Sequence, residues 1–133
     1  MQFVKNRTGR DIELELIGGE PSVHPDILRL CREASIISDV VLYTNYSLDF
    51  PIYQKMIDCG VVFDITYHQN GNTRNTKVLE NIRKTPKDSI RGINVMVDRK
   101  HFHENMEVLN ELRKCYPDID VDLQQVIIGT EVD

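Results

Sequence analysis

Residues 16–26, LIGGEPSVHPD, connect a predicted strand to a predicted helix and decide how the chain folds. Apolar residues before this segment alternate with acidic ones, which is the pattern of a half-buried strand. Gly18 and Gly19 then permit positive φ angles or a close approach of the backbone to a ligand. Glu20 and Pro21 follow. We therefore expect a sharp turn with a carboxylate at the carboxyl end of a strand, where α/β proteins bind their ligands.

The Glu20 carboxylate has two interpretations at this stage. Its oxygens only accept hydrogen bonds, so it suits a cationic partner such as an ammonium group. A tight strand-to-helix turn with a solvated glutamate explains the same residues without any ligand. The rest of the chain has to decide between these two interpretations.

The order of strand and then helix repeats along the whole chain. Strands are predicted near residues 11–17, 40–44, 61–67, 92–98 and 120–127, and helices near 25–37, 51–59, 75–84 and 102–115. Strands that alternate with helices predict right-handed βαβ units and a parallel sheet. A closed (β/α)8 barrel needs about 250 residues. Because the chain has 133 residues, we expect one α/β domain over 1–133, either a partial (β/α) barrel or an open parallel sheet of about five strands flanked by helices. The polar segment 1–10 leaves no room for a preceding strand and helix.

Composition excludes several classes of function. The net charge of −5 argues against a nucleic-acid binder, which usually carries a basic face. No segment reaches the roughly 20 apolar residues that span a membrane, and no signal segment opens the chain, so we expect a cytoplasmic protein. Cys31, Cys59 and Cys115 lie far apart in predicted helices. This spacing matches neither a disulfide framework nor a zinc site, and we expect buried thiols that act as small apolar groups.

Polar residues follow or interrupt the predicted strands. Thr44 and Asn45 end the second strand, and His68 ends the third. Asn94 and Gln124 lie inside otherwise apolar strands, where a polar side chain must find a partner or a ligand. His68 is the obvious candidate for acid–base chemistry, although a histidine at a strand end more commonly has a structural hydrogen-bonding role. Together these side chains suit a polar ligand with an amine, hydroxyls and a carboxylate.

The order of these motifs resembles that of the radical S-adenosylmethionine (SAM) enzymes. GGEP at residues 18–21, followed by HPD at 24–26, is similar to the signature that follows the second barrel strand of that family. Thr44 and Asn45 resemble the end of the third strand, which commonly reads Thr-Asn-Gly. Tyr46 stands here in place of the glycine.

Two later strands extend the resemblance. Residues 63–68, FDITYH, are similar to the family's fourth strand, which ends in Ser-Leu-His or Ser-Tyr-His, and residues 93–97, INVMV, resemble the fifth. In order and spacing the resemblance covers about residues 11–127. GGEP alone is moderately specific, and the later strand ends at the expected distances make the resemblance considerably more so.

The resemblance implies a site for SAM. In the family, the GGE segment holds the amino group of SAM, which assigns Gly18, Gly19 and Glu20 to the methionyl ammonium. Thr44 would then lie beside the ligand, and His68 and Asn94 near its sugar or the substrate. The full set of expected cofactor-binding residues is Gly18, Gly19, Glu20, Pro21, Thr44, Asn45, His68, Asn94 and Gln124.

The chain departs from the family in the feature that supplies its chemistry. The family's CxxxCxxC loop gives three thiolates to a [4Fe–4S] cluster. No such loop is present in this sequence, whose closest cysteine pair is Cys31 and Cys59. We therefore expect that this chain alone does not cleave SAM, assign it no catalytic residue or metal ligand, and place the cluster only in a full-length parent.

Three hypotheses follow from the sequence. The first is a fragment or truncated form of a radical SAM enzyme, the second a non-catalytic binding or scaffold module derived from that barrel, and the third a plain α/β domain, such as a flavodoxin-like protein, with a coincidental GGEP. A CxxxCxxC motif upstream in the parent reading frame would decide for the first. A half barrel also has two open strand edges, so we expect residues 11–17 or 120–127 to pair with another chain, most simply in a homodimer.

Overall fold

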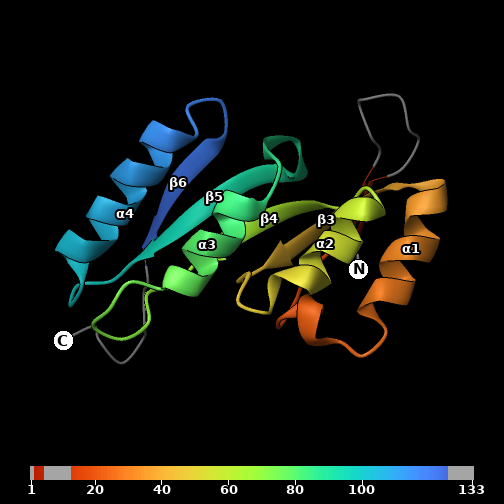
Figure 1. The fold of residues 1–133 in the computed structure, drawn as a ribbon, viewed down its shortest axis with the longest axis horizontal. Coiled ribbons are helices and arrows are strands. Elements are labelled where there is room, and N and C mark those ends of the chain that lie inside the picture. The colour runs from red at the N-terminus through yellow and green to blue at the C-terminus, as the bar shows by residue number, and fades with distance from the viewer. Residues whose placement is uncertain (1, 5–12, 126–133) are drawn as a thin grey trace.

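The computed structural model describes residues 2–4 and 13–125. Its elements are β1 Gln2–Val4, β2 Glu13–Leu16, α1 Ile27–Ile37, β3 Asp39–Thr44, α2 Phe50–Asp58, β4 Val62–Tyr67, α3 Thr76–Lys84, β5 Ile90–Val97, α4 Phe102–Cys115 and β6 Asp120–Gln125. Two 3-10 turns cover Pro21–Val23 and Lys87–Ser89. From β2 onward the elements follow the predicted alternation of strand and helix (Figure 1). The outer positions 11, 12, 126 and 127 of the predicted strands lie outside the described residues.

The strands form one sheet in the order β1-β2-β3-β4-β5-β6. Strands β2 to β6 are all parallel, which confirms the predicted α/β class and the parallel sheet of about five strands. Right-handed crossovers that always step in the same direction place every helix on the same face, and Figure 1 shows the helices along one side of the sheet. A flavodoxin-like sheet has the order 2-1-3-4-5, so this topology is not flavodoxin-like. The strand order shows no barrel closure.

The segment before β2 differs from the prediction. Gln2–Val4 forms a short strand that pairs antiparallel with β2, with Phe3 opposite Leu14. Pairing of this kind uses backbone groups, so a segment without an apolar run can supply it. The edge at 11–17 is therefore covered within the chain over Glu13–Glu15. The predicted pairing with another chain now concerns only the edge at 120–127, where it stays a prediction.

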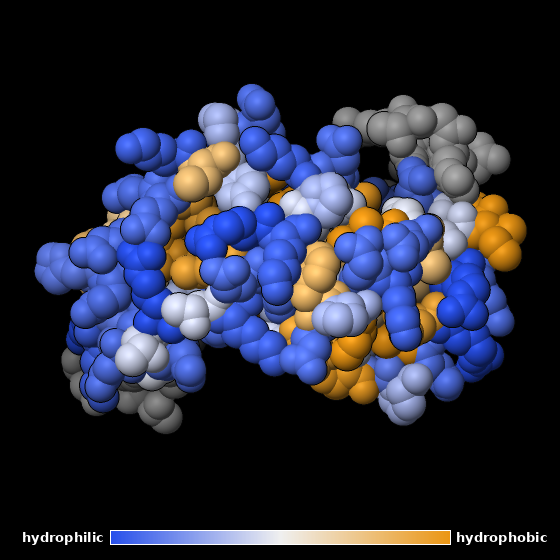
Figure 2. Space-filling view, in the orientation of Figure 1, coloured by the Kyte–Doolittle hydropathy of each residue, from blue (hydrophilic) through white to orange (hydrophobic). Residues whose placement is uncertain are grey.

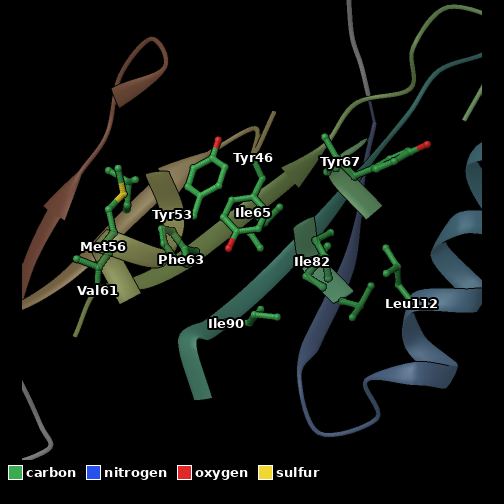
Figure 3. Close-up of a cluster of buried hydrophobic side chains, with 14 of the residues drawn as sticks. Tyr46, Tyr53, Met56, Val61, Phe63, Ile65, Tyr67, Ile82, Ile90 and Leu112 are labelled. Atoms are coloured by element: carbon green, nitrogen blue, oxygen red, sulfur yellow. The ribbon is translucent and has the colours of Figure 1, made fainter. Parts of the chain in front are cut away.

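One face of the sheet is covered by the helices. Its strand residues alternate along the chain and include Leu42, Phe63 and Ile65, each 0% exposed. They belong to one hydrophobic cluster to which all the helices contribute, through Ile27 and Cys31, Tyr53 and Met56, Val78 and Ile82, and Val108, Leu109 and Leu112. Figure 3 shows the part of this cluster around Tyr46, Tyr53 and Phe63. Figure 2, viewed as Figure 1, shows a mainly hydrophilic outer surface with hydrophobic atoms between the helices.

The opposite side of the sheet, which we call the open face, carries the alternate residues of the same strands. The register places Tyr43 beside Asp64 and Asp64 beside Gly92, and it places Thr66 beside Asn94. No described helix packs on this side. Its residues in β2 to β6 include Glu13, Glu15, Asp39, Val41, Tyr43, Val62, Asp64, Thr66, Gly92, Asn94, Met96, Asp120, Asp122 and Gln124. Within the described chain, no helix has the length and apolarity needed to cross a membrane.

Candidate functional site

The connection from β2 to α1 begins with two residues in left-handed conformations. Gly18 has φ +101° and Gly19 has φ +50°. An added Cβ at either position would meet no atom within 4 Å, so the backbone conformation requires glycine there and packing does not. Both residues are exposed. The turn therefore presents bare backbone at the carboxyl edge of the sheet, as the sequence predicted.

The Glu20 carboxylate is fastened to the end of β3. Its Oε2 accepts hydrogen bonds from the Thr44 hydroxyl at 2.8 Å, from the Ser22 N–H at 3.1 Å and from the Ser22 hydroxyl. Its Oε1 accepts the Asn45 N–H at 2.6 Å. A carboxylate offers about four lone-pair directions, two on each oxygen; three of these donors share Oε2 and one uses Oε1, which leaves one direction of Oε1 without a protein donor among these bonds. Glu20 is therefore a brace that links the β2–α1 turn to β3. Neither a carboxylate that binds a cationic ligand nor a solvated glutamate, the two interpretations of the sequence, included these contacts.

Tyr46 adopts a left-handed conformation, φ +59°. It stands where the radical SAM family, which the sequence resembles, commonly has glycine. For a residue with a Cβ this conformation costs about 1–2 kcal/mol. The ring offsets that cost because it is fully buried, stacks on Tyr53 at a centroid distance of 4.1 Å and meets Phe63 at 5.0 Å. Its hydroxyl is hydrogen-bonded to Thr85, and the Asn81 amide donates to its carbonyl at 2.9 Å. Burial raises the pKa of Tyr46.

His68 lies at the carboxyl end of β4, as predicted, but the structure does not bring it to the Glu20 brace. The side chain is exposed, and the carbonyl of His68 accepts a hydrogen bond from the Asn75 amide at 2.9 Å. Asn75 in turn caps α3 through its side-chain oxygen. The contacts of this residue therefore indicate a backbone role in shaping the β4–α3 connection.

Asn94 finds its partner on the open face. Its amide nitrogen donates to Asp64 Oδ1 at 3.2 Å. The sequence analysis did not single out Asp64, although its alternation with Phe63 and Ile65 places it on the face opposite the apolar residues; what the pattern could not give is its contact with Asn94 on the next strand. Burial raises the pKa of Asp64, and the nearby carboxylates Glu15 and Asp122 raise it further, while Arg91 opposes them.

Gln124 does not behave as the sequence argument requires. The argument assumed a buried strand, but β6 lies at the edge of the described sheet and Gln124 is exposed. Of its six residues only Val121 is buried. Because water can solvate an exposed amide, the burial that made a partner or ligand for Gln124 necessary is not present, and a ligand contact for this residue stays a prediction.

A second polar network at the carboxyl edge was also missed. Asp98 Oδ1 accepts from the His101 N–H at 2.7 Å and lies 3.0 Å from His101 Nδ1, while His101 Nε2 lies 2.7 Å from Asn72 Oδ1. The fully buried Asn105 accepts the Asp98 N–H at 3.1 Å and donates to Gln69 at 2.8 Å. Burial opposes the charged form of Asp98, but the bonds from His101 outweigh it and lower the pKa. The network joins the β4–α3 and β5–α4 connections.

The described cysteines do not form a site for an iron–sulfur cluster. Cys31 is fully buried in α1, and burial raises its pKa to about 11, with a further contribution from Cys59. Cys115 is exposed at the end of α4, which packs on β5 and β6, so the expectation of buried thiols fails there. No group of metal-binding side chains is present among the described residues. A cluster needs closely placed thiolates, and these positions do not supply them.

The structure thus groups the predicted residues unevenly. Gly18, Gly19, Glu20, Thr44 and Asn45 meet at one corner of the carboxyl edge, with Pro21 in the 3-10 turn that Glu20 caps. Asn94 lies with Asp64 on the open face, Gln124 lies on the same face at the edge strand β6, and His68 follows β4 at the carboxyl edge. Comparisons of the chain with protein-family models and with curated proteins found no match.

Proposed function

We propose that this chain is a fragment or truncated form of a radical SAM-type barrel, in which the β2–α1 turn binds the amino-acid end of SAM. The observation that carries the proposal is a turn with two exposed left-handed glycines whose acid is fastened to the next strand. The consecutive order of the parallel strands supports it, because (β/α)8 barrels have that order. The carboxyl ends of the strands are also where such barrels bind ligands.

In this proposal the residues of the corner have different roles. The backbone carbonyls around Gly18 and Gly19 accept hydrogen bonds from the methionyl ammonium, since no Cβ blocks the approach. Glu20 contributes its negative charge from directly behind the turn and holds the turn in place through Thr44 and Asn45. Glu20 is therefore a positioning residue as well as a source of electrostatic attraction.

The proposed activity is binding. A [4Fe–4S] cluster would supply electrons for SAM cleavage in a full-length parent, and the described cysteines are not placed to hold one. The same binding without any chemistry is the second candidate, a non-catalytic module derived from the barrel. The placement of Cys31 on α1, which packs on β3, and of Cys115 on α4, which packs on β5 and β6, agrees with both candidates, because neither takes cluster ligands from this chain.

Calorimetric titration with SAM tests the proposal. Glu20→Gln replaces one acceptor oxygen with a donor that faces other donors. We expect it to weaken SAM binding by about 1.5–3 kcal/mol, the range for hydrogen bonds to charged groups, which is roughly 10- to 150-fold in Kd. Glu33→Gln on the exposed side of α1 is the matched control and should leave Kd unchanged.

The unfolding midpoint of each variant in urea separates a loosened turn from an unfolded protein. Equal affinity of the wild type and Glu20→Gln would remove Glu20 from the site. No measurable binding of SAM to the folded wild-type chain would contradict the proposed function as a whole.

A further inference from the structure

The pairing of β4 with β5 contains one irregularity on the open face. Phe63 lies opposite Ile90, but Asp64 lies opposite Gly92, so Arg91 is an extra residue on β5. An extra residue of this kind bends the strand and redirects a side chain. Ile90 and Gly92 are both buried, whereas Arg91 is exposed between them. Gly92 lies opposite Asp64 on the open face, and Arg91 reaches Glu13 and Glu15 on that same face, so the bulge places two consecutive residues of β5 on one side of the sheet.

The redirected side chain reaches a strand that is not a neighbour of β5. Arg91 Nη1 lies 3.2 Å from Glu13 Oε2 and 3.4 Å from Glu15 Oε1, both on β2. The Glu15 side chain is 11% exposed, and its Oε1 also accepts the Tyr43 hydroxyl at 3.2 Å. An exposed ion pair alone contributes little to stability, but here the largely buried Glu15 carboxylate contacts both the Arg91 guanidinium and the Tyr43 hydroxyl. We call Arg91 with Glu13 and Glu15 the Arg91 bridge.

The Arg91 bridge joins two strands that are far apart in the sheet. Strands β3 and β4 lie between β2 and β5, and neighbouring strands are about 4.8 Å apart, so β2 and β5 would be separated by about 14 Å. Side chains stand roughly perpendicular to a sheet. The contact is therefore made by long side chains that extend toward one another over β3 and β4.

We propose that the Arg91 bridge, which lies near the amino end of β5, holds β2 and β5 together across the open face and so restrains the separation of the two connections that follow these strands. These are the β2–α1 turn with Gly18 and Gly19 and the β5–α4 connection that begins at Asp98. In a closed barrel the remaining strands would fix the separation of two such strands, and the proposal gives that role here to the ionic contact. An effect of the bridge on SAM binding would depend on the proposed function, whereas the restraint on β2 and β5 does not.

Other charged groups on the open face act on the bridge. Asp64 and Asp122 add negative charge that attracts Arg91, while Glu13 and Glu15 repel one another when Arg91 is absent. Screening by salt weakens contacts between partly exposed charges. The bridge is therefore a salt-sensitive restraint, and the open face widens when it breaks.

Distances between paired spin labels test this directly. Labels are placed on cysteines introduced at the exposed Val23 and Lys100, in a chain with Cys59→Ser and Cys115→Ser, because the buried Cys31 does not react. We expect a narrow distance distribution at low salt. Arg91→Met should shift it to longer distances and broaden it, and Arg99→Met, next to the same connection, should leave it unchanged. High salt should move the wild-type distribution toward that of Arg91→Met and leave the variant itself unaltered.

Breaking the bridge from the other side provides an independent check. Glu13→Gln with Glu15→Gln should reproduce the shift even if Arg91→Met does not fold. A distribution that stays the same in the folded variants and at high salt overturns the proposal. A shift without SAM binding would refute only the proposed function, and SAM binding with no shift would refute only the bridge.

Discussion

The two faces of β4 contrast within six residues. Phe63, Ile65 and Tyr67 are 0% exposed against the helices, whereas Asp64 and Thr66 between them are half-buried on the open face. The covered face contains the hydrophobic cluster and stabilises the fold. The open face contains the Asp64 carboxyl group, whose pKa is raised by burial. Raised pKa values of this kind are common at functional sites. One strand thus separates the fully buried residues of the hydrophobic cluster from half-buried polar residues on the other side of the sheet.

The contrast is tested most strongly by truncating one side chain on each face. Phe63→Ala removes a fully buried ring and should lower the free energy of unfolding by about 3–5 kcal/mol. Thr66→Ala on the open face should cost less than about 1 kcal/mol, as substitutions outside the core usually do. Urea unfolding followed by circular dichroism measures both. Similar losses for the two variants would show that the faces do not differ in this way.

Tyr46 tests whether burial outweighs backbone strain at the end of β3. Tyr46→Gly introduces the glycine that the family resembled by the sequence has here and relieves about 1–2 kcal/mol of strain, but it deletes a buried ring whose loss costs about 3–5 kcal/mol. We expect a net loss of roughly 1–4 kcal/mol in thermal or urea unfolding. Tyr46→Phe removes only the bond to Thr85 and should cost about 1 kcal/mol. A glycine variant more stable than the wild type would contradict this account.

Asp64 provides a test with a pH dependence. Its pKa is raised in the folded state, so the native protein binds the proton more tightly than the unfolded chain does. Stability is therefore lost as pH rises from the unfolded pKa through the higher folded pKa. Asp64→Asn should unfold at a higher urea concentration than the wild type at pH 7, and this advantage should vanish near pH 3. An advantage that persists at pH 3, or none at pH 7, would show that Asp64 is not destabilised by its surroundings.

Gly92 should give the smallest effect. A Cβ there would lie 3.5 Å from the Asp120 carbonyl and 3.8 Å from Asp64 Oδ2, which is ordinary contact. Because glycine inside a strand costs roughly 0.5–1 kcal/mol relative to alanine, Gly92→Ala should stabilise the domain by up to that amount. Urea midpoints at constant slope measure it. A marked loss of stability would mean that the open face beside Asp64 is tighter than described.

Local patterns in the sequence were sufficient for much of the fold. The alternation of apolar strands and amphipathic helices predicted the parallel sheet, and the glycine pair predicted the left-handed turn at Gly18 and Gly19. The strand at Gln2–Val4 could not be predicted in this way, because three residues carry no periodicity and their pairing depends on the β2 edge.

The site was harder to predict because it depends on contacts between distant segments. The donors to Glu20 come partly from residues 24 and 25 positions away, and those to Asp98 and Asn105 depend on loop placement. Gln124 and Asn94 look alike in the sequence, yet one lies on an edge strand and the other beside Asp64. Strand position in the sheet, which sequence pattern does not specify, separates them.

Hydrogen–deuterium exchange with and without SAM measures most directly whether the carboxyl edge of the sheet is the binding surface. We expect SAM to slow amide exchange at residues 18–20 and 44–46 and to leave the outer surfaces of α1 to α4 unchanged. Protection confined to the helices, or no change in the β2–α1 turn at saturating SAM, would contradict the account.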